Sequence, residues 1–318
     1  TSVLTTSHKL AGGAVLLLLF AMLFATPLAA AGPQRASQPQ PAPPAGAAVA
    51  AAPVMAPALA ALDTGVTMAA MAAALDIDPA DLIEISITSI IDTTAADSRA
   101  YGIANGGLGS YLPIQGASFV ILDCGDIGDI PGANDVTGQT TDLGDPGQPD
   151  DGVKLKVVLR VPAGMHTFSF YWHFLSEEYP EFVGSAFNDF FFCEVGATNI
   201  TYSGNTPSSP FNAIFDYSGK IMSINSDFFI QDVAQVTGTE FDGQTKLLRT
   251  CIPCTPGGTL TLYFSIADMG DAALDSAVFL DNFRFSSDAL ATALTVDART
   301  ATILGLNQNE VTPRAYPN

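Results

Sequence analysis

The stretch FSFYWHFLSEEYPEFVGSAFNDFFFCEV, residues 168–195, decides the fold. It contains two aromatic strand patterns, separated by an acidic and polar run, a Pro-Gly loop and the pair Asn188-Asp189. Carboxylates held between apolar strands are costly unless a cation, hydrogen-bond donors or a ligand compensates them. The stretch therefore predicts a β-rich protein with a polar site at the ends of its strands.

Hydrophobic residues elsewhere in the chain alternate with a period of two. Val153, Leu155 and Val157 share one face of a predicted strand, and Lys154 and Lys156 share the other, as expected for a half-buried strand. The same pattern predicts strands at 168–174, 260–266 and 277–285, with shorter strands at 119–122 and 190–195. Many short strands joined by Gly, Pro and Asn turns predict an all-β fold, a jelly-roll-like β-sandwich.

Helical periodicity is scarce. The best helical candidate is residues 78–85, with Asp78 as a cap and Pro79 in the first turn. Within the strand at 168–174, we expect Trp172 to belong to the core, with Phe170 on the same face. An aromatic platform for sugars formed by Tyr171, His173 and Tyr179 is the alternative.

The N-terminus resembles an export signal. A weakly basic start at His8 and Lys9 precedes an apolar run over 10–25 and small residues at 29–31, the pattern of a cleaved signal peptide. The run is short for a membrane span. We therefore predict a signal peptide at 1–31, a secreted protein, and no membrane span in the mature chain.

The remaining domain boundaries follow from composition. Residues 32–73 are almost only Ala, Pro, Gln, Gly and Met and predict a disordered linker, whose end at 69–75 could form a short helix. Residues 74–286 have the composition of one large β-domain. Residues 287–318 are assigned to a C-terminal tail.

The formal net charge of −20 bears on possible partners. Nucleic acid and anionic membrane surfaces require a basic face, so both are excluded as partners. Such a charge is compatible with cation binding and with a soluble exported protein.

The chain contains four cysteines, and an even number in an exported protein predicts disulfides. Three pairings are possible. We favour Cys251 with Cys254, which would close a Cys-Ile-Pro-Cys turn, and more weakly Cys124 with Cys193. A thioredoxin-type redox motif should open a helix, whereas Cys254 precedes a Pro-Gly-Gly turn and a strand.

Two acidic regions could bind a cation. Residues 123–151 contain eight Asp and six Gly without Lys, Arg or Glu, although a solvated acidic turn would have the same composition. The second region joins the acidic run after residue 175 to the loop before 277–285. For the second region we predict a Ca²⁺ site, because this ion takes six to eight oxygen ligands in irregular loops. Its candidate ligands are Glu177, Glu178, Asn188, Asp189, Asp268, Asp271 and Asp275.

Catalytic motifs are weak by comparison. A nucleophile elbow of the Gly-x-Ser-x-Gly type is absent from the sequence. Glu177 and Glu178 are neighbours, so in a strand they point to opposite faces and cannot flank one glycosidic bond. Individually, Asp and Asn side chains often only cap turns.

Two long motifs resemble a known family. FLSEEYPEFVGSAFNDFF at 174–191 and SIADMGDAALDSAVFLDNFRF at 265–285 are similar to the choice-of-anchor L family of bacterial exported proteins, and SFVILDCGD at 118–126 resembles an upstream strand of that family. The resemblance covers about residues 75–285. It implies a β-sandwich ectodomain joined to varied surface anchors, and it does not imply an enzyme. No anchor is recognisable after residue 285, which favours free secretion over surface tethering.

Together, these features predict a non-enzymatic, exported β-sandwich module that is stabilised by Ca²⁺ and acts in glycan adhesion or in adhesion to a surface or matrix protein. The alternative is a secreted polysaccharide hydrolase with Glu177, Glu178 or Asp268 in acid-base roles. A structural surface protein without a small ligand is the third possibility.

Overall fold

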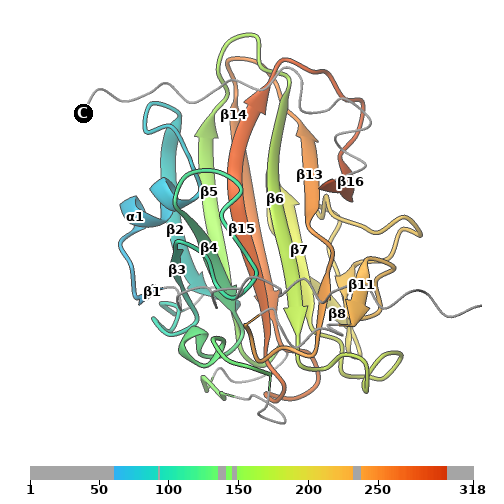
Figure 1. Cartoon of the computed structure of the whole chain (residues 1–318). Coiled ribbons are helices and arrows are strands. Elements are labelled where there is room, and N and C mark those ends of the chain that lie inside the picture. The colour runs from blue at the N-terminus through green and yellow to red at the C-terminus, as the bar shows by residue number, and fades with distance from the viewer. Residues whose placement is uncertain (1–60, 92–93, 135–140, 145–148, 232–237, 299–318) are drawn as a thin grey trace, which may run out of the picture. The chain divides into compact units, whose positions relative to one another are not determined.

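Two antiparallel sheets dominate the computed structural model, which describes residues 61–91, 94–134, 141–144, 149–231 and 238–298 (Figure 1). The first sheet has the order β1-β3-β4-β15-β6-β12-β11, with β13 also pairing with β6 and β16 pairing with β13. Its strands are β1 (Ala61–Thr64), β3 (Tyr101–Asn105), β4 (Ser118–Asp123), β6 (Thr167–Ser176), β11 (Phe229–Gln231), β12 (Gly243–Thr245), β13 (Leu248–Pro253), β15 (Ser276–Ser286) and β16 (Leu294–Asp297).

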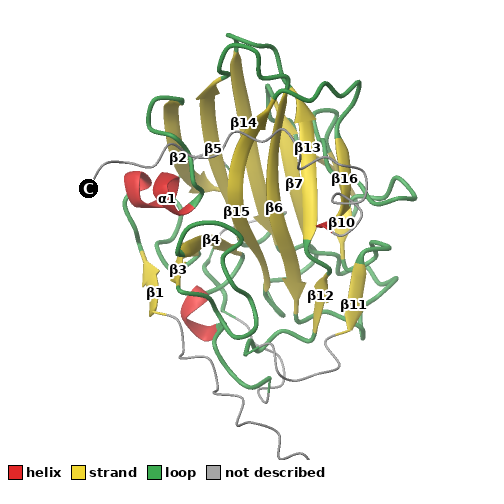
Figure 2. Ribbon diagram, turned by 45° about the horizontal axis from the view of Figure 1, so that its top comes forward, coloured by secondary structure: helices red, strands yellow, loops and turns green. Residues whose placement is uncertain are grey.

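The second sheet has the order β10-β7-β14-β5-β2. Its strands are β2 (Leu82–Ser89), β5 (Gly152–Arg160), β7 (Phe190–Val195), β10 (Met222–Ser223) and β14 (Thr259–Ala267). A small hairpin of β8 (Thr201–Ser203) and β9 (Thr206–Ser208) stands apart from both sheets. The α-helix α1 (Met68–Ala74) and the 3₁₀ turn η1 (Ile127–Asp129) are short, and Figure 2 shows loops gathered at both ends of the long strands.

Aromatic side chains fill the space between the sheets. The ring of Phe170 in β6 lies 5.1 Å from that of Phe264 in β14, and the Trp172 ring lies 5.1 Å from that of Phe191 in β7. Edge-to-face and tilted ring pairs at such distances add to the stabilisation from apolar burial. The predicted all-β sandwich is confirmed, and so are the six strands expected from alternation. Trp172 is buried, as expected for a core residue.

The folded unit extends beyond the predicted boundaries at both ends. Residues 61–73 were assigned to the linker, but β1 pairs with β3, and α1 buries Met71 completely. The helix confirms the alternative considered for 69–75. In the predicted tail, β16 pairs with β13. The predicted signal peptide and the linker up to residue 60 lie outside the described residues.

The helix predicted at 78–85 is wrong. Asp78 does accept a hydrogen bond from the backbone N–H of Ala80 at 2.8 Å, but it caps only a tight turn. The chain then enters β2, which pairs with β5 through Ile85 and Ile87. β-branched residues that fit a half-buried pleated surface outweigh the local capping signal.

We expect Trp172→Ala to lower the free energy of unfolding by about 3–5 kcal/mol, because the change leaves a large cavity in the core. It also removes the hydrogen bond that Trp172 Nε1 donates to Thr250 Oγ1 at 2.9 Å. Ile83→Ala at a half-exposed position is the control, and denaturant unfolding measures both. A loss below about 1 kcal/mol for Trp172→Ala would contradict the core assignment.

A second prediction concerns His173, whose Nδ1 lies 3.2 Å from the carbonyl oxygen of Thr245. Burial lowers the pKa of His173 to about 4. Between this value and about 6.5, the unfolded chain binds a proton that the folded protein does not, so stability falls as pH falls through this window. From pH 7 to 4.5, the wild type should lose on the order of 2 kcal/mol more than His173→Gln. Unfolding by urea at both pH values measures the difference, and His166→Gln at an exposed position should behave like the wild type.

Candidate functional site

Six strand ends converge at one end of the sandwich, and a carboxylate stands at each of them. The strands β4, β6 and β14 finish there, while β5, β7 and β15 begin there, at the lower end in Figure 1. We call the six carboxylates the acidic rim: Asp123, Asp151, Glu178, Asp189, Asp268 and Asp275. Each of these residues is at most 1% exposed. The rim therefore brings six acidic groups from both sheets out of contact with bulk water.

The centre of the rim is formed by Cys124, Asp189 and Asp268, whose ligand atoms lie within 4.8 Å of one another. The Cys124 thiol donates to Asp268 Oδ1 at 2.6 Å, and its sulfur lies 4.0 Å from Asp189 Oδ2. Cys124 Sγ also accepts the backbone N–H of Ser276 at 3.0 Å. These atoms are spaced closely enough to share one cation.

Hydrogen bonds satisfy only part of the rim. Asp189 accepts from the Ser276 hydroxyl at 2.7 Å and from the backbone N–H of Met269 at 3.0 Å. Asp123 Oδ2 and Asp268 Oδ2 are buried and have no hydrogen-bond partner. In the described part of the chain, no lysine or arginine donates to Asp123, Asp189, Asp268 or Asp275. Buried, unpaired carboxylate oxygens of this kind require a cation or a proton.

The pKa values of the rim reflect this deficit. Burial raises the pKa of Asp189 and of Asp275 to about 7, and that of Glu178 to about 9. Burial also raises the pKa of Asp268 and of Asp123 well above the usual range, and a neighbouring carboxylate adds to each shift, Asp189 for Asp268 and Asp275 for Asp123. Without a cation, the rim must therefore hold protons near neutral pH.

Local turn chemistry explains how the rim becomes so compact. Asp123 Oδ1 accepts the backbone N–H of Gly125 at 2.7 Å, which turns the chain sharply after β4. A Cβ atom on Gly125 would lie 1.9 Å from Asp275 Oδ2, so a side chain there would displace this carboxylate. Backbone N–H groups of the acidic stretch 123–151 complete the packing, since Thr141 donates to Asp275 and Leu143 to Asp151.

The structure brings four of the seven predicted ligands into the rim, namely Glu178, Asp189, Asp268 and Asp275. Glu177 is buried beside the rim, where the carboxylates of Asp242 and Glu240 act on it most strongly and that of the rim residue Asp275 acts less. Burial and these charges raise its pKa to about 9. Asp271 is exposed, although its charge still acts on Glu178 and Asp189.

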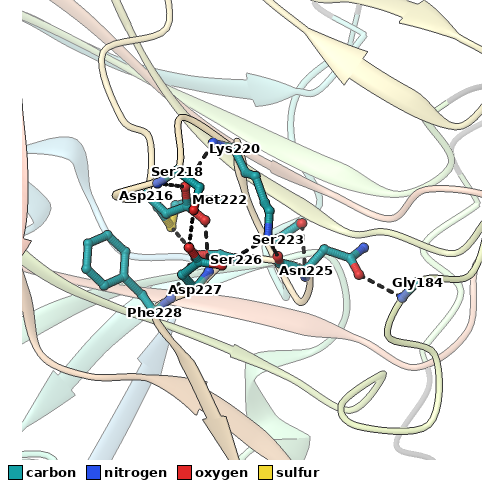
Figure 3. A network of polar contacts seen from close by, with 10 residues as sticks. All are labelled: Gly184, Asp216, Ser218, Lys220, Met222, Ser223, Asn225, Ser226, Asp227 and Phe228. Atoms are coloured by element: carbon teal, nitrogen blue, oxygen red, sulfur yellow. Dashed lines mark hydrogen bonds and ion pairs between the residues drawn. The ribbon is translucent and has the colours of Figure 1, made fainter. Parts of the chain in front are cut away.

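The seventh predicted ligand, Asn188, takes part in a different network. Its Oδ1 accepts a hydrogen bond from Asn225 Nδ2 at 2.6 Å. Asn225 belongs to a polar network within residues 216–228, shown in Figure 3, where Asn225 Oδ1 accepts the backbone N–H of Gly184 at 2.7 Å. In the same network, Lys220 donates to Asp227 at 2.9 Å. Asn188 therefore links the rim residue Asp189 to this loop.

Sequence reasoning missed Cys124 and did not join the stretch 123–151 to the second acidic region. Asp123, Asp151 and Asp268 each lie at or next to a strand end. In an antiparallel sheet, the end of one strand lies beside the start of its neighbour. Recognising from the sequence that these strand ends lie side by side would have identified the complete rim.

Both predicted disulfides are absent, and all four cysteines, each within the described residues, are free thiols. Cys124 lies in the acidic rim, whereas Cys193 is packed in the core between the sheets. Cys251 belongs to β13, and the backbone N–H of Cys254 donates to the carbonyl of His166 at 2.8 Å, which prolongs the pairing with β6. Three extended residues span about 10 Å, beyond the Cα–Cα reach of a disulfide.

Comparison with known proteins places this architecture in a family. Residues 76–286 match the choice-of-anchor L domain. The chain belongs to the choice-of-anchor L family. The family is one of bacterial surface or exported proteins. The two ends of the described unit, with β1, α1 and β16, lie outside the matched residues.

Similarity to solved structures is distant, and no curated protein matches the chain significantly. TmCBM61, solved in complex with β-1,4-galactotriose, is 12% identical, with a TM-score of 0.29 over 67% of this chain and 90% of that protein. The K2 cleaved adhesin domain of Lys-gingipain is 10% identical, with a TM-score of 0.27 over 63% of this chain and 88% of that domain. In the described part of this choice-of-anchor L protein, no helix has the length and apolar character needed to cross a membrane.

We expect four titratable thiols when the choice-of-anchor L protein is unfolded without a reductant. Before unfolding, Cys124 and Cys193 should react least, because both are fully buried and burial raises the pKa of each thiol. Ellman titration of native and denatured protein, purified from an oxidising compartment, measures both states. Two thiols or fewer after denaturation would restore the disulfide prediction.

Proposed function

We propose that this chain is an exported, non-catalytic β-sandwich module that binds Ca²⁺ at the acidic rim and adheres to a glycan, or to a surface or matrix protein. The observation that supports cation binding is the convergence of six buried carboxylates, of which Asp123 and Asp268 each retain an oxygen without a donor. One cation would compensate charges that otherwise repel each other in a medium of low dielectric.

Ca²⁺ fits this donor set better than a softer metal. It accepts six to eight oxygens in irregular geometry, and carboxylates and backbone carbonyls from loops are its usual ligands. Burial raises the pKa of the Cys124 thiol well above its usual value, and the neighbouring Asp268 adds to the shift. A protonated thiol can donate to Asp268 beside the ion. A metal that prefers sulfur, such as Zn²⁺, would require the thiolate instead.

Burial of the acidic groups favours a binding module over a hydrolase. Glu177, Glu178 and Asp268 are at most 3% exposed. A glycosidase must place two carboxyl groups on either side of a bound glycosidic bond. Groups this deeply buried are out of reach of a polysaccharide, and Glu177 lies among other carboxylates than Glu178 does.

Ca²⁺ should raise the midpoint of thermal unfolding, and a chelator should lower it. A ligand bound only by the folded state adds RT ln(1 + [L]/Kd), about 2.7 kcal/mol at a hundredfold excess over Kd. Asp268→Asn and Asp189→Asn should each remove most of the dependence on Ca²⁺. Differential scanning calorimetry, with Ca²⁺ and with EGTA, measures both midpoints.

Asp142→Asn is the matched control, because Asp142 is exposed in the same acidic stretch and its carboxylate only caps a turn at Gly144. Its dependence on Ca²⁺ should equal that of the wild type. A midpoint that ignores both Ca²⁺ and EGTA would contradict the cation site. A larger shift with Zn²⁺ that Cys124→Ser abolishes would replace Ca²⁺ by a metal that binds thiolate.

A further inference from the structure

Exposed aromatic side chains gather in one short segment of this protein. In the part of the chain that the structure describes, the exposed phenylalanine, tyrosine and tryptophan side chains are those of Phe211, Phe215 and Tyr217, which are 38%, 39% and 62% exposed. We call these three residues the aromatic row. Single exposed apolar residues need no explanation, whereas a group of them marks an interaction site.

Burial alternates along the end of this segment. Ile214 and Asp216 are buried, while Phe215 and Tyr217 are exposed. Phe211 lies beside β7, where its carbonyl accepts a backbone N–H at 3.0 Å. Two residues of chain span at most about 7 Å, and six span at most about 21 Å. The three rings therefore share one narrow strip of the surface.

The buried carboxylate of Asp216 holds the loop that carries the row. It accepts the backbone N–H groups of Ser218, Lys220 and Asp227 at 2.8 to 2.9 Å (Figure 3). Local hydrogen bonds from an Asp side chain to the backbone fix the conformation of a turn. The loop is therefore preorganised, so that a ligand would bind without a large cost for ordering it.

The side chain of Tyr217 is itself held in place. Its ring lies 4.6 Å from the ring of Phe228, and its hydroxyl donates to Asp297 at 3.2 Å. More than half of its surface nevertheless remains in contact with water. A fixed ring with this exposure is a contact surface that loses little side-chain entropy on binding.

The charged groups beside the row are paired within the protein. Lys220 donates to Asp227 at 2.9 Å, Asp216 accepts the three backbone donors, and Asp297 accepts from Tyr217. The net charge of −20 also repels a polyanion. Rings flanked by paired charges favour an uncharged ligand.

The size of the row argues against a protein partner. A stable protein interface buries about 800 Å² on each side, which is more than three partly exposed rings in one strip provide. A second copy of this chain would also bring the same net charge of −20 towards the first. A sugar ring has an apolar C–H face and polar hydroxyl edges, so it matches an aromatic ring surrounded by polar backbone.

We propose that the aromatic row binds an uncharged polysaccharide, with sugar rings stacked on Phe215 and Tyr217 and a further contact at Phe211. This inference rests on the proposed adhesion to glycans and narrows it to neutral ones. The row lies outside the acidic rim, so its function can be tested separately from cation binding.

Affinity electrophoresis of the whole protein, with Ca²⁺ present, tests this inference. Each native gel contains one polysaccharide: hydroxyethylcellulose, a β-1,3-glucan, galactomannan or the anionic polymer alginate. We expect a neutral polymer to retard the wild type and alginate to leave its migration unchanged. Tyr217→Ala and Phe215→Leu should each weaken the affinity about tenfold, as the loss of a central contact residue does. Phe215→Tyr keeps the ring and should bind like the wild type.

Leu112→Ala is the matched control, because Leu112 is 65% exposed but lies in the loop between β3 and β4. It should bind like the wild type. Phe215→Leu preserves apolar character without the ring, so it distinguishes stacking from general hydrophobic contact. Substitutions of exposed side chains should leave the midpoint of thermal unfolding nearly unchanged, which shows that the variants are folded.

Each outcome supports or overturns the inference. If a neutral polysaccharide retards the wild type, Tyr217→Ala and Phe215→Leu equally, the row assignment is wrong and the proposed adhesion stands. The assignment is also wrong if the wild type binds a matrix protein and no polysaccharide. If the wild type binds neither, the proposed adhesion fails with it, and the dependence of the unfolding midpoint on Ca²⁺ still reports on the rim.

Discussion

The need to compensate buried negative charge at one end of the sandwich dominates the structure. Antiparallel pairing places three strand ends beside three strand beginnings, and each contributes an acidic side chain to the rim. Carboxylates removed from water repel each other strongly, so they hold protons, bind a cation or push the strands apart. In this structure Gly125 packs directly against Asp275, so the strands are not pushed apart and protons or a cation must compensate the charge.

The aromatic core supplies the stability that such a rim requires. Rings from β6 and β14 interlock between the sheets, as the 5.1 Å separation of Phe170 and Phe264 illustrates. Full burial of a large side chain contributes about 1.5–3 kcal/mol, so a few such residues offset an incompletely compensated carboxylate. Strand β6 places Trp172 in the core and ends two residues before Glu178. This one strand therefore connects the apolar interior to the polar site.

Much of the fold could be predicted from alternation alone. Strands such as 153–161 and 277–285 bury one or both faces, and the order of their apolar and polar residues reflects which faces are buried. The helix predicted at 78–85 failed, since Asp78 caps a turn as readily as a helix. The ends of the unit failed too, because Met71 is buried by tertiary contacts that its Ala-rich neighbours do not reveal. At the site, sequence proximity grouped Glu177 with Glu178, whereas strand topology separates them and adds Asp123 and Cys124 instead.

The rim also constrains the register of the second sheet. β5 begins beside Asp151 and β14 ends beside Asp268, so these two carboxylates flank one antiparallel pair of strands. The backbone N–H of Asp268 donates to the carbonyl of Asp151 at 2.9 Å. A cation bound at the rim would hold the start of β5 against the end of β14 and preserve the register that places Leu155 opposite Phe264. Because the ion would bind only this arrangement of the strands, its binding free energy would add to the stability of the whole sandwich.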